Sequence, residues 1–86
     1  IGTWETVYNY LKKDDNGNVV DGNALLIETE NILVQSSKKK LIATIGVDNL
    51  VIIETDDAIL VARRDKSDQV KKILEELEKR TMKEYL

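Results

Sequence analysis

The stretch VIIETDDAILVA, residues 51–62, is the main sequence evidence for the fold, because a close variant of it, LLIETENILVQ, occurs at residues 25–35. The tripeptide IET occurs at 27–29 and again at 53–55, an offset of 26 residues (53 − 27 = 26). Repetition at a fixed period of roughly 20–50 residues is typical of architectures in which successive turns of chain stack on one another. The repeat therefore predicts stacked turns of chain, and it does not identify a catalytic or binding residue.

The middle of the chain consists of short apolar runs separated by polar breaks. The runs are ALLIE (24–28), ILVQ (32–35), LIATI (41–45), LVIIE (50–54) and AILVA (58–62). Each has the length and the β-branched content of a β-strand. Several are apolar without alternation, which is typical of strands that are covered on both faces or packed against a partner outside the chain.

One period of 26 residues holds three of these strands, so the sequence predicts a short parallel β-helix-like coil of about two rungs. Equivalent strands would then pair in parallel, with Ile27 lying on Ile53. The rival interpretation is an antiparallel meander, in which the breaks TEN (29–31) and TDD (55–57) are hairpin turns. Both breaks lack the Gly that tight hairpin turns favour, which favours corners of a coil.

A helix is predicted on each side of the coil. TWETVYNYLKK (3–13) carries an apolar stripe, with Thr3 as its N-cap, and it should end at the turn DDNGN (14–18). SDQVKKILEELEKR (67–80) has Ser67 as a predicted N-cap and a second apolar stripe: Val70, Ile73, Leu74 and Leu77. This helix begins where a sixth strand would fall (41 + 26 = 67). It is therefore expected to cap the open end of the coil, or to form a dimer seam.

Composition excludes several classes of function. The chain has 86 residues, no Cys and no His, so thiolate chemistry, disulfides and the commonest general base are all absent. A net charge of −3 argues against a nucleic-acid partner, and no apolar run approaches the roughly 20 residues of a membrane span. The basic run at 38–40 is interpreted as a solvated turn and not as a phosphate site, since no Gly-rich loop accompanies it.

Three groups of residues are candidate sites. Glu28 and Glu54 would stack on adjacent rungs as a carboxylate pair, but strand ends that face water are the favoured interpretation. The alternation of Asp14, Asn16 and Asn18 imitates a calcium loop, but the Gly and the final Glu of that motif are missing. The aromatic cluster of the first helix, favoured as an interface, consists of Trp4, Tyr8 and Tyr10.

The chain resembles the carboxyl-terminal part of the mannose-1-phosphate guanylyltransferase (GDP-mannose pyrophosphorylase) family over residues 1 to about 80. The resemblance is carried by IGTW (1–4), DDNGNVV (14–20), LLIETENILVQS (25–36) and LIATIGVDNLVIIETDDAILVARRDKSDQVKKILEEL (41–77). It implies a parent enzyme that makes GDP-mannose and pyrophosphate from GTP and mannose 1-phosphate with a magnesium ion. A cytoplasmic location is expected separately, because the sequence shows no signal segment and no membrane span. In that family the metal-holding Asp would precede Ile1, so only Gly2, Thr3 and Trp4 match the end of the motif.

The resemblance implies that this chain is itself non-catalytic, with no catalytic, cofactor-binding or metal-binding residue and no cofactor of its own. Residues 1–18 would be the end of the nucleotidyltransferase domain, 19–66 the β-helix-like domain and 67–86 the capping helix. The expected partners are that N-terminal domain and a second copy of the chain, and an isomerase domain follows in some relatives. The first residue, Ile1, is not Met, so a piece of a longer polypeptide is expected. The alternative function is a free-standing protein-interaction module with no enzymatic role, which would be preferred if the gene encoded nothing upstream of Ile1.

Overall fold

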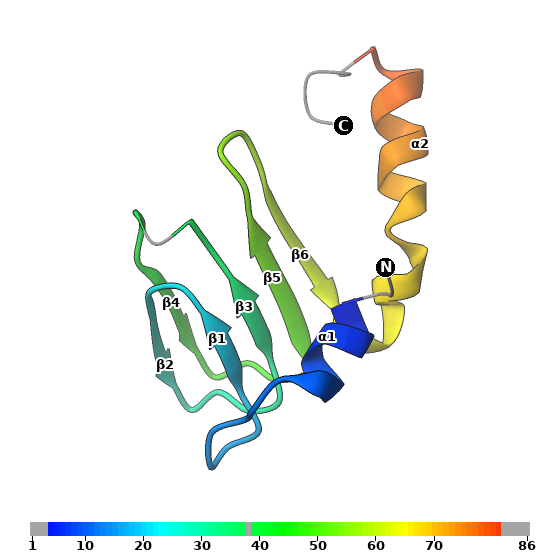
Figure 1. Cartoon of the computed structure of the whole chain (residues 1–86). Coiled ribbons are helices and arrows are strands. Elements are labelled where there is room, and N and C mark those ends of the chain that lie inside the picture. Colours follow the sequence, from blue (N-terminus) through cyan, green and yellow to red (C-terminus); the bar gives the residue numbers. More distant parts are fainter. Residues whose placement is uncertain (1–3, 38, 82–86) are drawn as a thin grey trace.

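The structure is a computed structural model that describes residues 4–37 and 39–81 (Figure 1). In chain order its elements are α1 (Trp4–Tyr10), β1 (Val19–Asp21), β2 (Ala24–Ile27), β3 (Leu33–Gln35), β4 (Ile42–Ile45), β5 (Leu50–Glu54), β6 (Ile59–Arg63), the 3₁₀ helix η1 (Arg64–Gln69) and α2 (Lys71–Lys79). The five predicted strands are present within about one residue of their expected bounds. The three-residue strand β1 was not predicted, because VVD is too short to stand out in the sequence.

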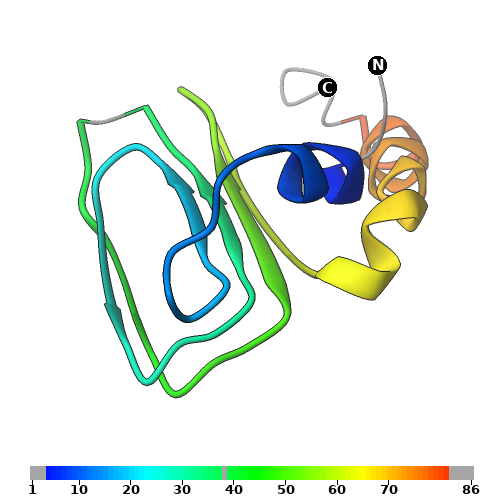
Figure 2. The ribbon, with the colours of Figure 1, turned by 60° about the horizontal axis from the view of Figure 1, so that its bottom comes forward.

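The strands form a β-helix-like coil. One sheet has the order β1-β3-β5-β6 and the other pairs β2 with β4; every pairing is parallel except that of β5 with β6. Seen along the coil, successive turns of chain lie on one another, and α1 lies outside the larger sheet (Figure 2). The predicted fold class is therefore confirmed: parallel rungs flanked by short helices.

The predicted period of 26 residues is wrong, and the observed period is 18. Ile27 pairs with Ile45 (45 − 27 = 18), and Ile53 pairs with Gln35, so Ile27 and Ile53 lie in different sheets. Each rung contains two strands and not three. The corners mark this period better than the strands, because Asn31 and Asn49 both adopt positive φ, 58° and 55°, at matching positions. The signal was present in the sequence as NILV (31–34) and NLVI (49–52).

The two similar breaks have different structures. TEN (29–31) is a coil corner, where Glu30 bridges to Asp48 of the next rung. TDD (55–57) is the turn of the β5–β6 hairpin, closed by a hydrogen bond from the Thr55 amide to the Ala58 carbonyl at 2.9 Å. The prediction that both breaks are corners is therefore wrong for the second. Asp residues in the turn take the place of the expected Gly.

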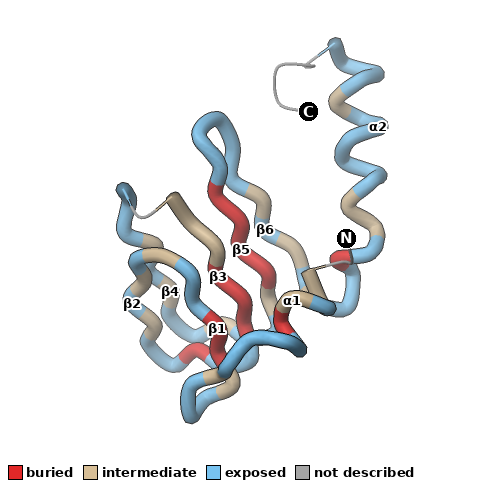
Figure 3. Tube along the Cα trace, viewed as in Figure 1, coloured by how far each residue is buried: buried red, intermediate tan, exposed pale blue. Residues whose placement is uncertain are grey.

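The buried residues are concentrated in β3 and β5 (Figure 3), and they form two separate clusters. Inside the coil, Ile32, Val34 and Ile52 pack together. Outside it, α1 covers a second cluster: Tyr8, Val19, Leu33, Val51 and Ile53. Strands β3 and β5 are therefore covered on both faces, as their continuous apolar sequences predict. In β2, β4 and β6 every second residue is exposed, so these strands are not covered on both faces within the chain. The other expectation, that such faces pack against a partner outside the chain, stays a prediction for them.

The Asp14–Asn18 loop closes the end of the coil at which β1 begins. Asn18 is buried, and its side chain accepts a hydrogen bond from the Ile32 amide at 3.1 Å and donates one to the Thr29 carbonyl at 3.0 Å. The turn has positive φ at Gly17, as the Asn-Gly pair predicts. Asn18 therefore satisfies two backbone groups that the first corner would otherwise leave unpaired in the interior.

Replacing Asn18 with alanine is expected to lower the free energy of unfolding by about 2–3 kcal/mol, because two buried backbone groups lose their partners. Chemical denaturation followed by Trp4 fluorescence measures this change. Asn16→Ala, an exposed change in the same loop, is the matched control and should alter the free energy of unfolding by less than about 1 kcal/mol. Equal effects of the two substitutions would contradict this role for Asn18.

The C-terminal helix begins later than predicted. Ser67 lies within η1 and is buried, while α2 begins at Lys71 with no side-chain cap. Ser67 is therefore not an N-cap, because the chain first makes a 3₁₀ turn that leads away from β6. The helix was expected to cap the open end of the coil, but the element that pairs with the edge of β5 is strand β6. The predicted cap at Thr3 falls outside the described residues. No helix in the described part of the chain is long and apolar enough to cross a membrane.

Candidate functional site

The side chain of Arg64 makes three hydrogen bonds and one ring contact, and it joins α1 to the coil. Its Nε and Nη2 donate to the two carboxylate oxygens of Glu5, at 3.0 and 3.1 Å, and its Nη1 donates to the Asn31 carbonyl at 2.9 Å. The guanidinium also lies 3.8 Å from the centre of the Tyr8 ring. We call these four residues, Glu5, Tyr8, Asn31 and Arg64, the joint.

The chain positions Arg64 by its backbone as well. The Arg64 amide donates to the Asn49 carbonyl at 2.7 Å, so the residue is held at the corner between β6 and η1. Glu5 stands in the first turn of α1, and Tyr8 follows one turn later and donates from its hydroxyl to the Gly17 carbonyl at 2.6 Å. Hydrogen bonding to Glu5 raises the pKa of the Arg64 guanidinium, so this arginine is charged at every physiological pH.

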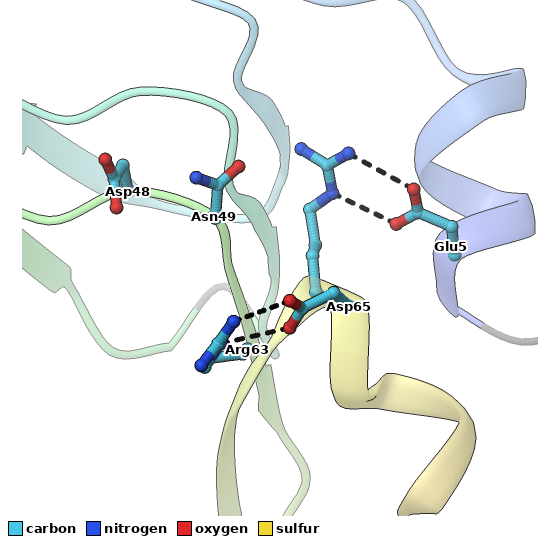
Figure 4. Close-up of a pocket in the computed structure, with 6 residues that line it drawn as sticks. Glu5, Asp48, Asn49, Arg63 and Asp65 are labelled. Atoms are coloured by element: carbon cyan, nitrogen blue, oxygen red, sulfur yellow. Dashed lines mark hydrogen bonds and ion pairs between the residues drawn. The ribbon is translucent and has the colours of Figure 1, made fainter.

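A polar cleft of about 450 Å³ lies beside the joint (Figure 4). Asp48 and Asn49 line one side from the corner before β5, and Glu5 lines the other from α1. Arg63 and Asp65 form a second ion pair across its base, with Nη2 and Oδ2 2.6 Å apart. The charged groups that line the cleft are thus largely neutralised by one another, which is typical of a structural joint.

The candidate carboxylate pair is not brought together. Glu28 follows β2 and is exposed, with a positive φ of 47°, whereas Glu54 ends β5 and is buried. Glu54 accepts hydrogen bonds from the amide and the hydroxyl of Ser37, at 3.2 and 3.3 Å, and pairs with Lys40 at 3.8 Å. The interpretation that both face water is right for Glu28 and wrong for Glu54. The two carboxylates do not stack, because the 18-residue period places them in different sheets.

The three aromatic side chains of α1 also differ from one another in burial. Tyr8 is part of the core, so the prediction that it belongs to an interface is wrong; Tyr10 is 88% exposed, and Trp4 is half-buried. The basic run is represented by Lys39 and Lys40, both exposed, which agrees with its interpretation as a solvated turn. Lys38 lies outside the described residues.

The loop that imitates a calcium site is organised by hydrogen bonds. The Asp14 carboxylate accepts from the amides of Asn16 and Asn18, at 2.8 and 2.9 Å. The bond from the Asn18 amide lowers the pKa of Asp14, because it stabilises the charged carboxylate. Within residues 4–37 and 39–81, no three acidic side chains are grouped so that they could hold a metal ion.

An apolar groove of about 430 Å³ lies between α2 and the outer face of the β5–β6 hairpin. Ile73 and Leu74 of α2 are more than 40% exposed on one side, and Trp4 and Leu60 line the other side. Exposed apolar surface of this kind marks interaction sites. The sequence predicted the stripe on α2 but not the groove, because its position depends on the η1 turn.

The joint could not be predicted from the sequence. Glu5 and Arg64 are 59 residues apart and only the fold brings them together. The one available signal was the doubled arginine at 63–64 directly after an apolar strand.

Similarity to known proteins extends over almost the whole chain. Residues 22–77 match the model of the MannoseP isomerase/GMP-like beta-helix domain family. Mannose-1-phosphate guanylyltransferases of Klebsiella pneumoniae and Escherichia coli are both 42% identical over 85 residues, which is 99% of this chain and 18% of theirs. The alginate biosynthesis protein AlgA of Pseudomonas aeruginosa is 35% identical over 91% of this chain and 16% of its own length.

A solved structure, described as a mannose-1-phosphate geranyltransferase from Thermus thermophilus, superposes with a TM-score of 0.78. It is 27% identical, and the alignment covers 88% of this chain and 23% of that one. The chain thus spans about a fifth of the length of the relatives that it matches. On its parallel rungs and on these matches, the chain belongs to the MannoseP isomerase/GMP-like beta-helix domain family, and mannose-1-phosphate guanylyltransferases are its relatives.

Proposed function

We propose that the chain is the structural and dimerisation part, C-terminal to the nucleotidyltransferase domain, of a mannose-1-phosphate guanylyltransferase. The reaction of the whole enzyme would convert GTP and mannose 1-phosphate into GDP-mannose and pyrophosphate, with magnesium as its cofactor, in the cytoplasm. The chain itself would carry no catalytic residue. The observation that supports this proposal best is the joint, in which the Arg64 guanidinium holds α1 against the coil by three hydrogen bonds and a ring contact.

The joint suits a domain connector. It holds α1 by a two-pronged ion pair, and two-pronged pairs constrain orientation as well as distance. In the proposed enzyme the nucleotidyltransferase domain precedes α1, so a rigid α1 fixes that domain relative to the coil. The apolar groove lies at the same place, since Trp4 lines it, and the nucleotidyltransferase domain is its proposed occupant.

A chimaera tests the proposal. The region of the Klebsiella pneumoniae guanylyltransferase that matches this chain is replaced by residues 1–86, and GDP-mannose formation and native mass are measured. The chimaera should keep activity within about tenfold of the parent, because the two sequences are 42% identical across the whole replaced region. The matched control lacks the region and should lose both activity and assembly.

The purified chain alone is expected to form no GDP-mannose from GTP and mannose 1-phosphate in the presence of magnesium. Turnover above the buffer blank would overturn its non-catalytic role. A chimaera as inactive as the deletion control would overturn the proposal that the chain is part of a mannose-1-phosphate guanylyltransferase. That result would favour the alternative, an interaction module without an enzymatic role, whose surface would be the apolar groove.

A further inference from the structure

The Asp14–Asn18 loop contains the only Asn-Gly dipeptide of the sequence, Asn16-Gly17. Asparagine is a thermolabile residue, and it reacts most readily when glycine follows it, because no Cβ hinders the backbone amide of the next residue. Every other asparagine of the chain precedes a residue that has a side chain. The Asn16 side chain is exposed and makes no hydrogen bond within the described residues, so water reaches its amide group.

The reaction at such a dipeptide is deamidation, and its atoms come from the chain and from water. The Gly17 nitrogen attacks Cγ of Asn16, the bond from Cγ to Nδ2 breaks, and the amide proton leaves with the side-chain nitrogen as ammonia. Water then opens the cyclic imide. Cleavage of its bond to Cγ gives aspartate. Cleavage of its bond to the backbone carbonyl carbon gives isoaspartate, whose main chain is longer by a methylene group.

In the folded loop the attacking group is held away from this reaction. The Gly17 amide donates to the Asp14 carbonyl at 3.0 Å, and the Gly17 carbonyl accepts from the Tyr8 hydroxyl at 2.6 Å. Gly17 has a positive φ of 79°, and a Cβ on it would overlap the side chain of Asn31. The glycine is therefore fixed in place, and its nitrogen turns toward Cγ of Asn16 only if the bond to Asp14 breaks.

The backbone of Asn16 is held as well. Its amide donates to the Asp14 carboxylate at 2.8 Å, and its carbonyl accepts from the Asn31 amide at 3.0 Å. The same carboxylate accepts from the Asn18 amide at 2.9 Å. Imide formation requires rotation of the backbone between Asn16 and Gly17, which these bonds oppose. The reaction should therefore proceed from an opened loop, and loops open locally more readily than the whole domain unfolds.

We propose that Asn16 is a deamidation site which the folded Asp14–Asn18 loop restrains, and that isoaspartate at this position irreversibly opens the end of the coil that the loop closes. In isoaspartate the carbonyl that accepts from the Asn31 amide becomes a carboxylate branch beside the main chain. Asn16→Ala keeps the length of the backbone, so it does not imitate this product. The proposal concerns the chain itself and does not depend on the reaction proposed for the whole enzyme.

The effect of the longer backbone should reach the interior through Asn18. Its amide is held by the Asp14 carboxylate, and its buried side chain satisfies the Ile32 amide and the Thr29 carbonyl. Lengthening the loop two residues before Asn18 displaces this side chain from both groups. The deamidated chain is therefore expected to melt at least about 4 °C below the unmodified chain.

The first test is incubation of the purified chain at mildly alkaline pH, which favours loss of the amide proton, followed by peptide mass spectrometry. Deamidation replaces NH₂ by OH, so a gain of mass identifies the modified peptide. Asp21-Gly22 can form the same imide, but water returns it to aspartate or isoaspartate with no change of mass. In urea, where the loop is open, Asn16 should react at least about tenfold faster than in the folded chain.

Substitutions in the loop test the restraint. Asp14→Ala removes the bonds to the amides of Asn16 and Asn18 and should speed deamidation of the folded chain at least about fivefold. The matched control is Asp15→Ala, which removes an exposed carboxylate that makes no hydrogen bond in the described chain and should change the rate less than about twofold. In urea all three chains should react within about twofold of one another, because the substitutions act through the fold.

Tyr8→Phe gives a second, independent readout. It keeps the ring in the core and removes only the hydroxyl that donates to the Gly17 carbonyl. Deamidation of the folded chain should become at least about threefold faster. Circular dichroism establishes that each variant is folded, and if Asp14→Ala is not, Tyr8→Phe decides.

Each part of the proposal has an outcome that overturns it. Deamidation of Asn16 as fast in the folded chain as in urea, or equal rates in the folded Asp14→Ala, Tyr8→Phe and Asp15→Ala variants, overturns the restraint. No gain of mass at Asn16 in urea overturns the site. Ion exchange separates the deamidated chain, and Asn16→Asp carries the same new charge on an ordinary backbone. If the deamidated chain melts no lower than Asn16→Asp, the opening of the coil is overturned.

Discussion

Leu33→Ala is expected to lower the free energy of unfolding by about 3–5 kcal/mol. Leu33 is 1% exposed and lies in the middle of the sheet, packed against Tyr8 and Val51. Truncation there removes the transfer free energy of the lost atoms and leaves a cavity between α1 and the coil. Because small domains have only about 5–15 kcal/mol of stability, this loss is a large share of the total, and the urea midpoint of the variant should fall clearly below that of the unsubstituted chain.

The matched control is Leu25→Ala. Leu25 is the same residue type in a strand of similar sequence, but it is 52% exposed on the outer face of β2. Its truncation should change the free energy of unfolding by less than about 1 kcal/mol. Urea denaturation, followed by circular dichroism, measures both. A loss of similar size at the two positions would contradict the burial of β3 between α1 and the coil interior.

Arg64→Ala is expected to lower the free energy of unfolding by about 2–3 kcal/mol. The substitution removes the two bonds to Glu5, the bond to the Asn31 carbonyl and the contact with the Tyr8 ring. It also leaves the Glu5 carboxylate beside the core without its counter-charge. Arg64→Lys should recover less than half of the loss, because an ammonium group cannot form the two-pronged pair and lie flat on the ring at the same time.

Arg80→Ala is the control for this change. Arg80 also pairs with a glutamate through Nε, at 2.9 Å from Glu76, but its side chain is 67% exposed. An exposed pair within one helix contributes roughly 0.3–0.5 kcal/mol. Denaturation followed by Trp4 fluorescence reports on α1 directly. If Arg64→Ala were no more harmful than Arg80→Ala, α1 would be held by its apolar contacts alone.

The local elements of this fold are readable from the amino-acid order alone. The apolar runs predict the strands within about a residue, and the stripe on TWETVYNYLKK predicts α1. These features are local: strand length, β-branched content and helical spacing act through neighbouring residues. The parallel coil was also predicted, although from a repeat with the wrong period, because a repeat with short breaks indicates stacked turns of chain even where it does not give the register.

The choice of which strands stack required the folded chain. IET at 27–29 and at 53–55 is the more conspicuous repeat, but the corners at Asn31 and Asn49 set the period at 18. A strand sequence is compatible with several partners, whereas a corner must adopt a particular backbone conformation, so the corners select the pairing. The joint and the buried Glu54 both follow from that selection. Each depends on contacts between residues distant in sequence, which no local pattern specifies.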